Sequence, residues 1–190
     1  LVSSSAASDV YKRQFLSNAP RPSFKVINFL LKMGMDKKYL SSVITSGEAA
    51  MYAINQNKFG KTFFHLGPPR DTSVFEKVKE NKTNIDQCDF ILCTGLFDDY
   101  DNDLNFYREF LKKYISKQFI CTNPDLTVHR GNIEEFCAGS EAKVFEELGG
   151  KVSYFGKPHP DVYKLCFNKK EKVLAIGDNL RTDIKGANNL

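Results

Sequence analysis

The stretch from Lys172 to Asp183 constrains the fold more than any other part of this chain. Its continuous apolar run, Val173 to Ile176, is typical of a strand buried on both faces of a parallel sheet. Gly177 ends the run, and two carboxylates, Asp178 and Asp183, follow at the carboxyl end of the predicted strand. Ligands of open α/β sheets bind at that edge. An acidic pair there suits Mg²⁺, which binds through one or two carboxylates and keeps water and phosphate oxygens as its other ligands.

A simpler interpretation of these residues stays open, in which Asp178 and Asn179 form a turn and Asp183 lies at a helix N-terminus. Two further motifs bear on the choice. Ser17-Asn18 follows the strand-like Phe15-Leu16 and precedes a helix, so its hydroxyl and backbone N–H groups could bind phosphate oxygens. An N-cap serine is the alternative interpretation.

The third motif is Gly156-Lys157-Pro158-His159-Pro160, which follows a predicted strand over 152–155. Lys157 at the strand's end could neutralise phosphate and a carboxylate as a point charge. The alternative is a solvated lysine before a proline-started helix, and we interpret His159 as structural. Lys157 precedes Asp178 by 21 residues, which is room for one helix and one strand, so both could lie at one sheet edge. Ser17 precedes Lys157 by 140 residues, which indicates an inserted α/β unit.

Strand and helix patterns alternate from Phe15 onward, and this predicts an α/β fold with mainly parallel sheets. The predicted strands cover 15–16, 43–44, 62–66, 89–93, 118–122, 152–155 and 173–176, and the predicted helices cover 24–34, 46–58, 72–79, 104–114, 140–148, 161–167 and the segment from 182. The stretch after Asn123-Pro124-Asp125 is predicted to be irregular.

Composition excludes several classes of protein. Of the 190 residues, 42% are hydrophobic and 26% charged, as in ordinary globular proteins. A net charge of +4, carried by scattered basic residues, argues against nucleic acid, and no apolar run has the length of a membrane span. Five cysteines without C-x-x-C spacing indicate reduced thiols and a cytoplasmic location. Residues 1–14 look like a non-native, adaptor-like leader and are left out of the fold prediction.

Together, Ser17-Asn18, Gly156-Lys157-Pro158 and the run from Gly177 to Asp183 resemble motifs two, three and four of the haloacid dehalogenase (HAD) superfamily. The long insert, with Thr122-Asn123-Pro124-Asp125 near its end, resembles the class IIA branch. The resemblance implies a HAD-like Rossmannoid core of parallel sheet, at 15–60 and 139–190, and an inserted α/β cap at 61–138. It also implies a Mg²⁺-dependent phosphatase acting on a small phosphorylated metabolite, with no nucleic-acid or membrane partner. A homodimer through the cap is an open alternative to a monomer.

The resemblance also assigns roles to residues. Ser17 resembles the hydroxyl that binds the transferring phosphoryl group, with Asn18 beside it, and Lys157 resembles the lysine that balances negative charge. Asp178 resembles the Mg²⁺ ligand, and Asp183 the acid that orients the metal shell or the lysine. Asn123, Asp125 and Asn179 are expected to border the substrate pocket.

One departure from the family limits this expectation. The family's nucleophile is the first aspartate of an Asp-x-Asp-Gly motif before motif two, and this sequence contains no such motif. The run from Asp99 to Asp103 lacks the glycine and lies inside the insert, so we interpret it as a solvated acidic loop. We therefore expect an internal fragment of a phosphatase that is inactive as it stands. The alternative is a non-catalytic protein that binds phosphate ligands in the same pocket.

Overall fold

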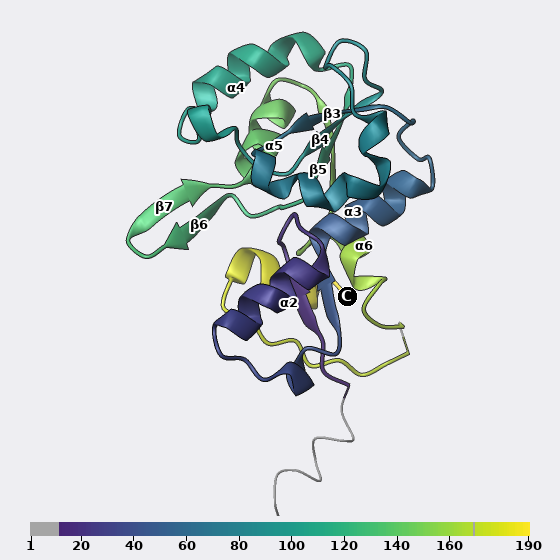
Figure 1. The fold of residues 1–190 in the computed structure, drawn as a ribbon, viewed down its shortest axis with the longest axis vertical. Helices are drawn as coiled ribbons and strands as arrows, with labels where there is room; N and C mark the ends of the chain where they lie inside the picture. The colour runs from purple at the N-terminus through teal and green to yellow at the C-terminus, as the bar shows by residue number, and fades with distance from the viewer. Residues whose placement is uncertain (1–11, 169) are drawn as a thin grey trace, which may run out of the picture.

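The fold contains one small and one large parallel sheet, together with a projecting hairpin (Figure 1). A computed structural model describes residues 12–168 and 170–190, apart from the side chain of Arg130. The predicted leader therefore lies almost entirely outside the described residues. The mixed architecture confirms the predicted α/β class. No helix among the described residues is long and apolar enough to cross a bilayer.

The small sheet is a β-α-β unit. Strand β1 (Phe15–Ser17) lies parallel to β2 (Val43–Thr45), and helix α2 (Ser23–Lys32) connects them through a short 3₁₀ turn, η1 (Lys37–Tyr39). Helix α3 (Ser46–Asn55) follows β2 directly, and its N-cap Thr45 accepts a hydrogen bond from the backbone N–H of Glu48 at 3.2 Å. The carboxyl ends of both short strands therefore open into loops or helix starts, as the sequence predicts.

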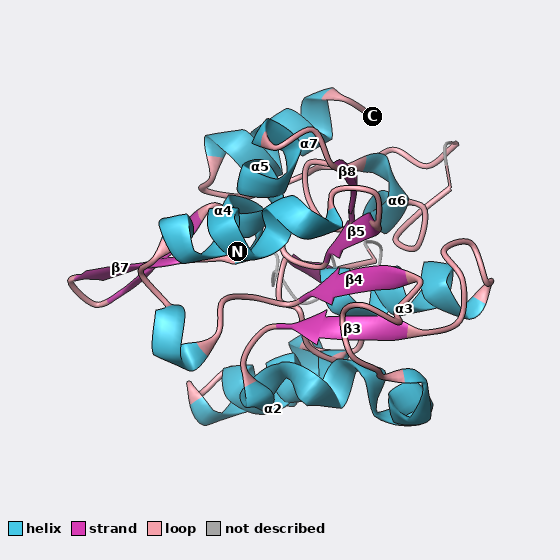
Figure 2. Cartoon of the chain, turned by 90° about the horizontal axis from the view of Figure 1, so that it is seen from above, coloured by secondary structure: helices cyan, strands magenta, loops and turns pink. Residues whose placement is uncertain are grey.

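The large sheet contains four parallel strands in the order β3-β4-β5-β8 (Figure 2). These strands are β3 (Phe63–Leu66), β4 (Phe90–Cys93), β5 (Gln118–Cys121) and β8 (Lys151–Tyr154). Alternate residues face opposite sides, because successive side chains of a strand point to opposite faces. Phe90 and Leu92 pack in the cluster that contains α3, whereas Ile91 and Cys93 pack against α4 (Leu104–Leu111) and α5 (Ala138–Glu147). Helices thus cover both faces, as a buried parallel sheet requires.

The connections within this unit are shorter and less regular than the sequence suggested. The predicted helix at 72–79 is a kinked 3₁₀ segment, η2 (Pro69–Asn81), and the acidic run contains only the turn η3 (Asp98–Tyr100), which is exposed as expected. Segment η4 (Lys112–Tyr114) extends α4. Helix α6 (Pro160–Tyr163) is shorter than its predicted range, and the chain ends in the π-helical η5 (Leu180–Ile184) followed by α7 (Lys185–Asn188).

Two predictions about secondary structure were wrong. The stretch after Asp125 is not irregular but forms a hairpin, β6 (Thr127–Arg130) and β7 (Ile133–Phe136), closed by a two-residue Gly-Asn turn. Gly131 has φ +63°, the left-handed conformation that such turns need. The turn signal was present in the sequence, but the two short flanking segments alternate too weakly in hydrophobicity to identify them as strands.

The second wrong prediction is the strand at Val173–Ile176. This segment forms no regular secondary structure, and Leu174 and Ile176 are 84% and 90% exposed. A strand requires a hydrogen-bonded neighbour, and within the described residues β1 and β2 pair only with each other. The apolar run therefore has no sheet to join in this structure, although its sequence is typical of a buried strand.

The division into core and cap stays a prediction. Strands β3, β4 and β5 come from the predicted cap at 61–138, and β8 comes from the predicted second core segment, yet all four lie in one sheet. Position 138 is therefore not a boundary between the two sheets. The return from the large sheet to the small one occurs after β8, at the loop that carries Lys157.

Candidate active site

Asn18 is the residue that joins the distant motifs. It follows β1, is 6% exposed, and uses its side-chain amide in three hydrogen bonds. Its Nδ2 donates to Asp125 Oδ1 at 3.1 Å and to the carbonyl of Lys157 at 3.0 Å. Its Oδ1 accepts the backbone N–H of Lys157 at 2.7 Å. One amide thus fixes the loop after β8 against the end of β1, because a buried amide must satisfy its donors and acceptor locally.

The loop after β8 can approach this amide only because residue 156 is glycine. Gly156 has φ +120°, and a Cβ there would lie 2.7 Å from Pro124 Cδ and 2.8 Å from Asn18 Oδ1. Both the conformation and the close approach exclude a side chain. The glycine before Lys157 therefore sets the position of the lysine.

Lys157 forms an ion pair with Asp183. The distance from Lys157 Nζ to Asp183 Oδ1 is 2.5 Å, and the two side chains are only 16% and 14% exposed. The other oxygen, Asp183 Oδ2, accepts the backbone N–H of Asn179 at 3.1 Å. Gly177 permits this closure, because a Cβ there would lie 2.3 Å from Asp183 Cβ. The loop before η5 is thus folded around the carboxylate that holds the lysine.

Asn179 and Asn123 organise the loops on either side of this ion pair. Asn179 is the N-cap of η5 and accepts the backbone N–H of Arg181 at 2.9 Å. Asn123 Oδ1 accepts the backbone N–H of Asp125 at 3.1 Å. Both amides therefore act on the backbone of the loops that border the cluster, which is the local role expected of an asparagine in a turn.

Asp125 adds a second carboxylate to the cluster. Burial raises the pKa of Asp125, and the negative charge of Asp183 acts in the same direction, whereas the hydrogen bond from Asn18 and the positive charge of Lys157 lower it. Asp125 and Asp183 thus share the field of one ammonium group. The site concentrates charge where little water can screen it.

Ser17 and Asp178 lie beside this cluster without a contact to it. Ser17 Oγ accepts the backbone N–H of Ala19 at 3.1 Å, and the residue is half-buried. Asp178 is exposed and lies between Gly177 and Asn179, both of which contact Asp183. The structure thus brings Asn18, Asp125, Lys157 and Asp183 into one bonded cluster. Ser17 directly precedes Asn18, and Asp178 lies five residues before Asp183 in the loop that folds around the Asp183 carboxylate.

The carboxylates of this region can supply some of the ligands of a Mg²⁺ ion. Both oxygens of Asp183 are engaged, whereas the exposed Asp178 carboxylate makes no hydrogen bond within the described residues. In the same part of the chain, no group of three or more His, Cys, Asp or Glu side chains could hold a metal ion. Because Mg²⁺ takes as few as one protein carboxylate and fills its remaining positions with water and phosphate oxygens, Asp178 fits the role of a single protein ligand.

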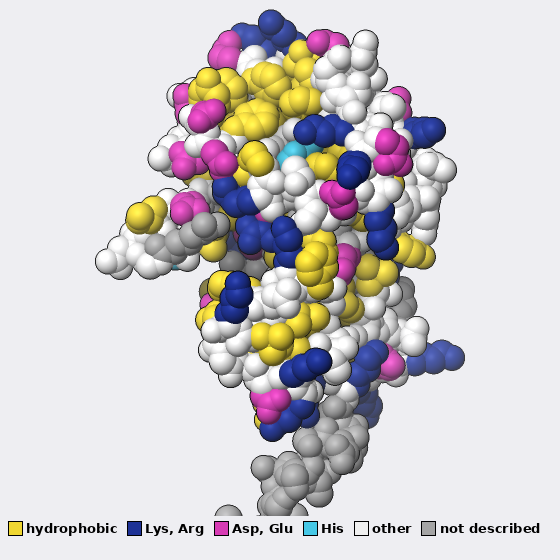
Figure 3. Space-filling view, viewed as in Figure 1, with side chains coloured by type: hydrophobic (Ala, Val, Ile, Leu, Met, Phe, Trp, Pro, Cys, Tyr) yellow, Lys and Arg dark blue, Asp and Glu magenta, His cyan; other side chains and the backbone are white. Residues whose placement is uncertain are grey.

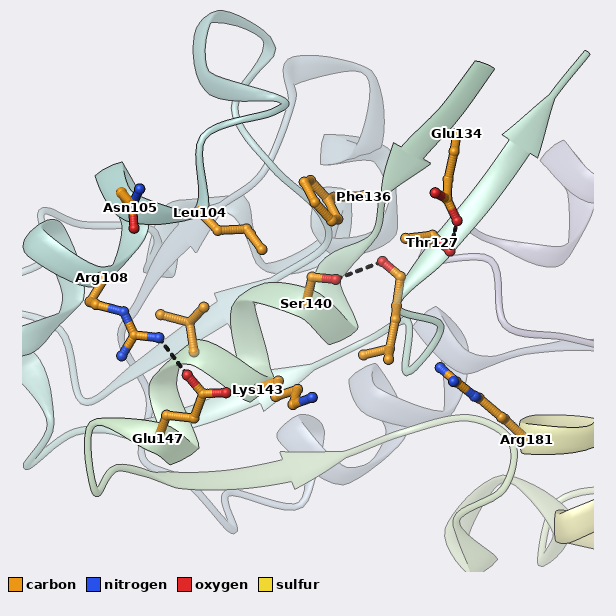
Figure 4. A pocket seen from close by; sticks show the side chains of 12 residues that line it. Leu104, Asn105, Arg108, Thr127, Glu134, Phe136, Ser140, Lys143, Glu147 and Arg181 are labelled. Carbon is orange, nitrogen blue, oxygen red and sulfur yellow. Dashed lines mark hydrogen bonds and ion pairs between the residues drawn. The ribbon is translucent and has the colours of Figure 1, made fainter. Parts of the chain in front are cut away.

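Arg181 was missed by the sequence prediction. Its side chain lines a pocket of about 460 Å³ together with residues of α4, α5 and the β6–β7 hairpin (Figure 4). An arginine between Asn179 and Asp183 was the available signal, but nothing in the spacing indicates which way its side chain points. The pocket lies near the cluster, because Leu126, which lines it, follows Asp125 directly in the chain.

Comparisons with known proteins agree with these motifs. A family model described as HAD-hydrolase-like matches residues 154–190. The ribonucleotide monophosphatase NagD of Escherichia coli K12 is 38% identical over 71 residues, which are 35% of this chain and 28% of that protein. The matched segment thus spans little more than a quarter of this relative.

Solved structures extend the match to most of the chain. A hydrolase of the haloacid dehalogenase-like family from Brucella suis 1330 is 31% identical, with a TM-score of 0.83 over 92% of this chain and 70% of that one. A 4-nitrophenylphosphatase from Thermotoga maritima is 27% identical, with a TM-score of 0.66 over 93% of this chain and 69% of that one. The chain therefore belongs to the haloacid dehalogenase superfamily of hydrolases, in its class IIA branch.

Proposed function

We propose that this protein is a Mg²⁺-dependent phosphatase that hydrolyses phosphoric monoesters of small metabolites. The observation that carries the proposal is the largely buried ion pair of Lys157 and Asp183. The backbone of Lys157 is hydrogen-bonded to the side chain of Asn18, which also donates to Asp125. Four polar residues from four separate parts of the sequence meet there. Phosphoryl transfer depends mainly on such positioning and charge neutralisation.

Each residue has a specific task in the proposed reaction. The ammonium of Lys157 neutralises the phosphate, and Asp183 keeps that ammonium in place from the opposite side. Ser17 turns its hydroxyl to a phosphoryl oxygen, because within the described residues its oxygen only accepts the backbone N–H of Ala19 and its own proton stays available for donation. A bound Mg²⁺ would supply a further positive charge for the phosphate oxygens, and Asp178 would hold it.

Four residues border the proposed substrate site rather than react. Asn18 fixes the Lys157 loop, and Asn123 and Asn179 shape the neighbouring turns. The positive charge of Lys157 acts on Asp125 as well as on Asp183, although burial raises the pKa of Asp125. In the proposed reaction a substrate phosphate joins these carboxylates at the ammonium of Lys157.

The nucleophile of the proposed reaction is an aspartate that forms an aspartyl-phosphate intermediate. The sequence contains no Asp-x-Asp-Gly, and this favours a second candidate function, a protein that binds phosphate ligands without turnover. The natural coding sequence upstream of the Phe15 codon separates the two. An Asp-x-Asp-Gly motif encoded there supports the phosphatase, and its absence supports the binding protein.

The direct test is phosphate release from a panel of small phosphomonoesters, measured on the protein encoded by the complete natural reading frame. We expect release with Mg²⁺, loss of release after chelation and recovery when Mg²⁺ is restored. Lys157→Met should abolish turnover, whereas Lys113→Met, at an exposed lysine of η4, should not. Turnover that persists in the Lys157 variant would contradict the proposed role of Lys157. Turnover that is unchanged by chelation would contradict the proposed role of Mg²⁺.

The cysteines and the surface charges support a proposal for the location of the protein and for its class of binding partner. All five cysteines are buried and none of them forms a disulfide, which supports a reducing, cytoplasmic compartment. Basic and acidic side chains are interspersed on the face seen in Figure 3, and this supports a small metabolite rather than nucleic acid or a membrane as the partner. A homodimer through the cap remains part of the proposal and is testable by sedimentation.

A further inference from the structure

The pocket beside the phosphate cluster has an apolar floor and a charged rim. Leu104, Phe136 and Val144 contribute apolar side chains, and the volume of about 460 Å³ is that of a pocket for a small organic group rather than for a lone ion. Figure 4 shows Arg181 reaching from the C-terminal segment toward the hairpin, on the opposite side from Arg108. The pocket is thus lined by elements that are far apart in the sequence.

The charges on its rim do not balance internally. Arg108 is paired with Glu147, and Glu134 accepts a hydrogen bond from Thr127 Oγ1 at 2.8 Å. The side chains of Lys143 and Arg181 also line the pocket, and neither has a hydrogen-bond or ion-pair partner among the residues that the structure describes. With three cationic and two acidic side chains, the pocket has a net positive charge, and Lys143 and Arg181 remain available to a ligand. An arginine and a lysine that face one apolar pocket favour an anionic group there.

Two residues that line the pocket lie close in the chain to members of the phosphate cluster. Asp125, which is hydrogen-bonded to Asn18, precedes the pocket residue Leu126. Asp183, which holds Lys157, lies two residues after Arg181. The helix start of α5 fixes the first connection, because Ser140 Oγ donates to the carbonyl of Leu126 at 2.7 Å. The pocket and the cluster are therefore neighbours in the fold.

We propose that this pocket selects substrates whose leaving group has a compact apolar body and ends in a second anionic group, recognised by Lys143 and Arg181. This inference rests on the proposed phosphatase function and narrows its substrate class. In such a substrate, one end carries the phosphate that meets Lys157, and the other end carries a carboxylate or a second phosphate. Monoesters with a neutral leaving group would use only the phosphate end.

The test compares two aryl phosphates that differ only in the charge at the far end. With Mg²⁺ present, 4-carboxyphenyl phosphate and its neutral isostere, 4-carbamoylphenyl phosphate, are titrated into the protein by calorimetry. We expect the carboxylate ester to bind about tenfold more tightly, the ratio typical of one additional charge-assisted hydrogen bond. Lys143→Met and Arg181→Met should each reduce that ratio, and the double variant should bring it close to one.

Matched controls keep failure of the pocket separate from failure of the phosphate site. Lys113→Met removes a lysine outside the pocket and should keep the wild-type ratio. The leaving groups alone, 4-hydroxybenzoate and 4-hydroxybenzamide, are titrated in the same way. Equal binding of both esters would overturn the pocket inference. If neither ester binds but 4-hydroxybenzoate is preferred through Lys143 and Arg181, the phosphatase proposal fails and the anion pocket stands. If none of the four compounds binds, both proposals fail.

Discussion

Removing the charge of Lys157 should separate two roles of this residue, one in stability and one in phosphate binding. In Lys157→Met, the Asp183 carboxylate loses its ion-pair partner while remaining only 14% exposed. Breaking a buried pair by removing one partner costs about 3–5 kcal/mol. The remaining exposure of this pair and the hydrogen bond from Asn179 to Asp183 place the expected loss at the low end, about 3 kcal/mol.

The double variant Lys157→Met/Asp183→Asn should recover most of that stability, because it leaves no unpaired charge. It should not recover phosphate binding. A hydrogen bond to a charged group contributes about 1.5–3 kcal/mol, so both variants should bind inorganic phosphate at least about tenfold more weakly than the wild type. Urea denaturation measures the first quantity and calorimetric titration with phosphate and Mg²⁺ measures the second.

Two results would refute this reasoning. If the double variant is as unstable as Lys157→Met, the loss comes from packing of the lysine stem and not from an uncompensated carboxylate. If phosphate affinity is the same in all three proteins, Lys157 is a structural ion-pair partner and has no place in the phosphate site.

Three further predictions concern the surroundings of this pair. Asn18→Ala should lower the free energy of unfolding by about 2–4 kcal/mol in urea denaturation, because the three hydrogen bonds of the Asn18 amide are lost. Asn28→Ala, on the exposed face of α2, is the control. An equal loss in the control would contradict the stabilising role of Asn18. Gly156→Ala should lower the free energy of unfolding by more than about 2 kcal/mol, because the new Cβ adds backbone strain and a close contact with Asn18. Gly131 also has a positive φ but has open space around it, so Gly131→Ala should lower the same free energy by about 1 kcal/mol. Similar losses in the two variants would show that the contact with Asn18 is irrelevant. Burial raises the pKa of the Glu141 carboxyl to about 8, so the folded state retains a proton that the unfolded state releases near pH 4.5. The free energy of unfolding should therefore fall as pH rises between those values, by at most about 1.4 kcal/mol per pH unit. In urea denaturation between pH 6.5 and 8, Glu141→Gln should flatten this decline, and an unchanged slope would show that another group titrates.

The local elements were predictable, whereas their partners were not. The amphipathic pattern of α2 and the apolar runs of β4 and β5 identify these elements because each depends on a few neighbouring residues. Val173–Ile176 has an equally strong pattern but forms no strand here, since pairing depends on a neighbour that local sequence does not specify. The sequence thus predicts which segments can form strands, but it predicts less well which of these segments pair with one another.

The site divides in the same way. Lys157 and Asp183 were identified from motifs, and the structure places them in contact. The three hydrogen bonds of Asn18 could not be predicted from spacing, because they join residues more than 100 positions apart. Arg181 was overlooked because the direction of its side chain depends on η5, a π-helical turn for which the sequence has no simple signal.

The most direct measurement is a crystal structure of the protein soaked with tungstate, an anion that mimics phosphate and is located by its anomalous scattering. The account predicts one anion within hydrogen-bond distance of Lys157 Nζ and Ser17 Oγ, on the side of the loop that carries Asp178. An anion bound elsewhere, with Lys157 still paired only to Asp183, would contradict the assignment of this cluster as a phosphate site.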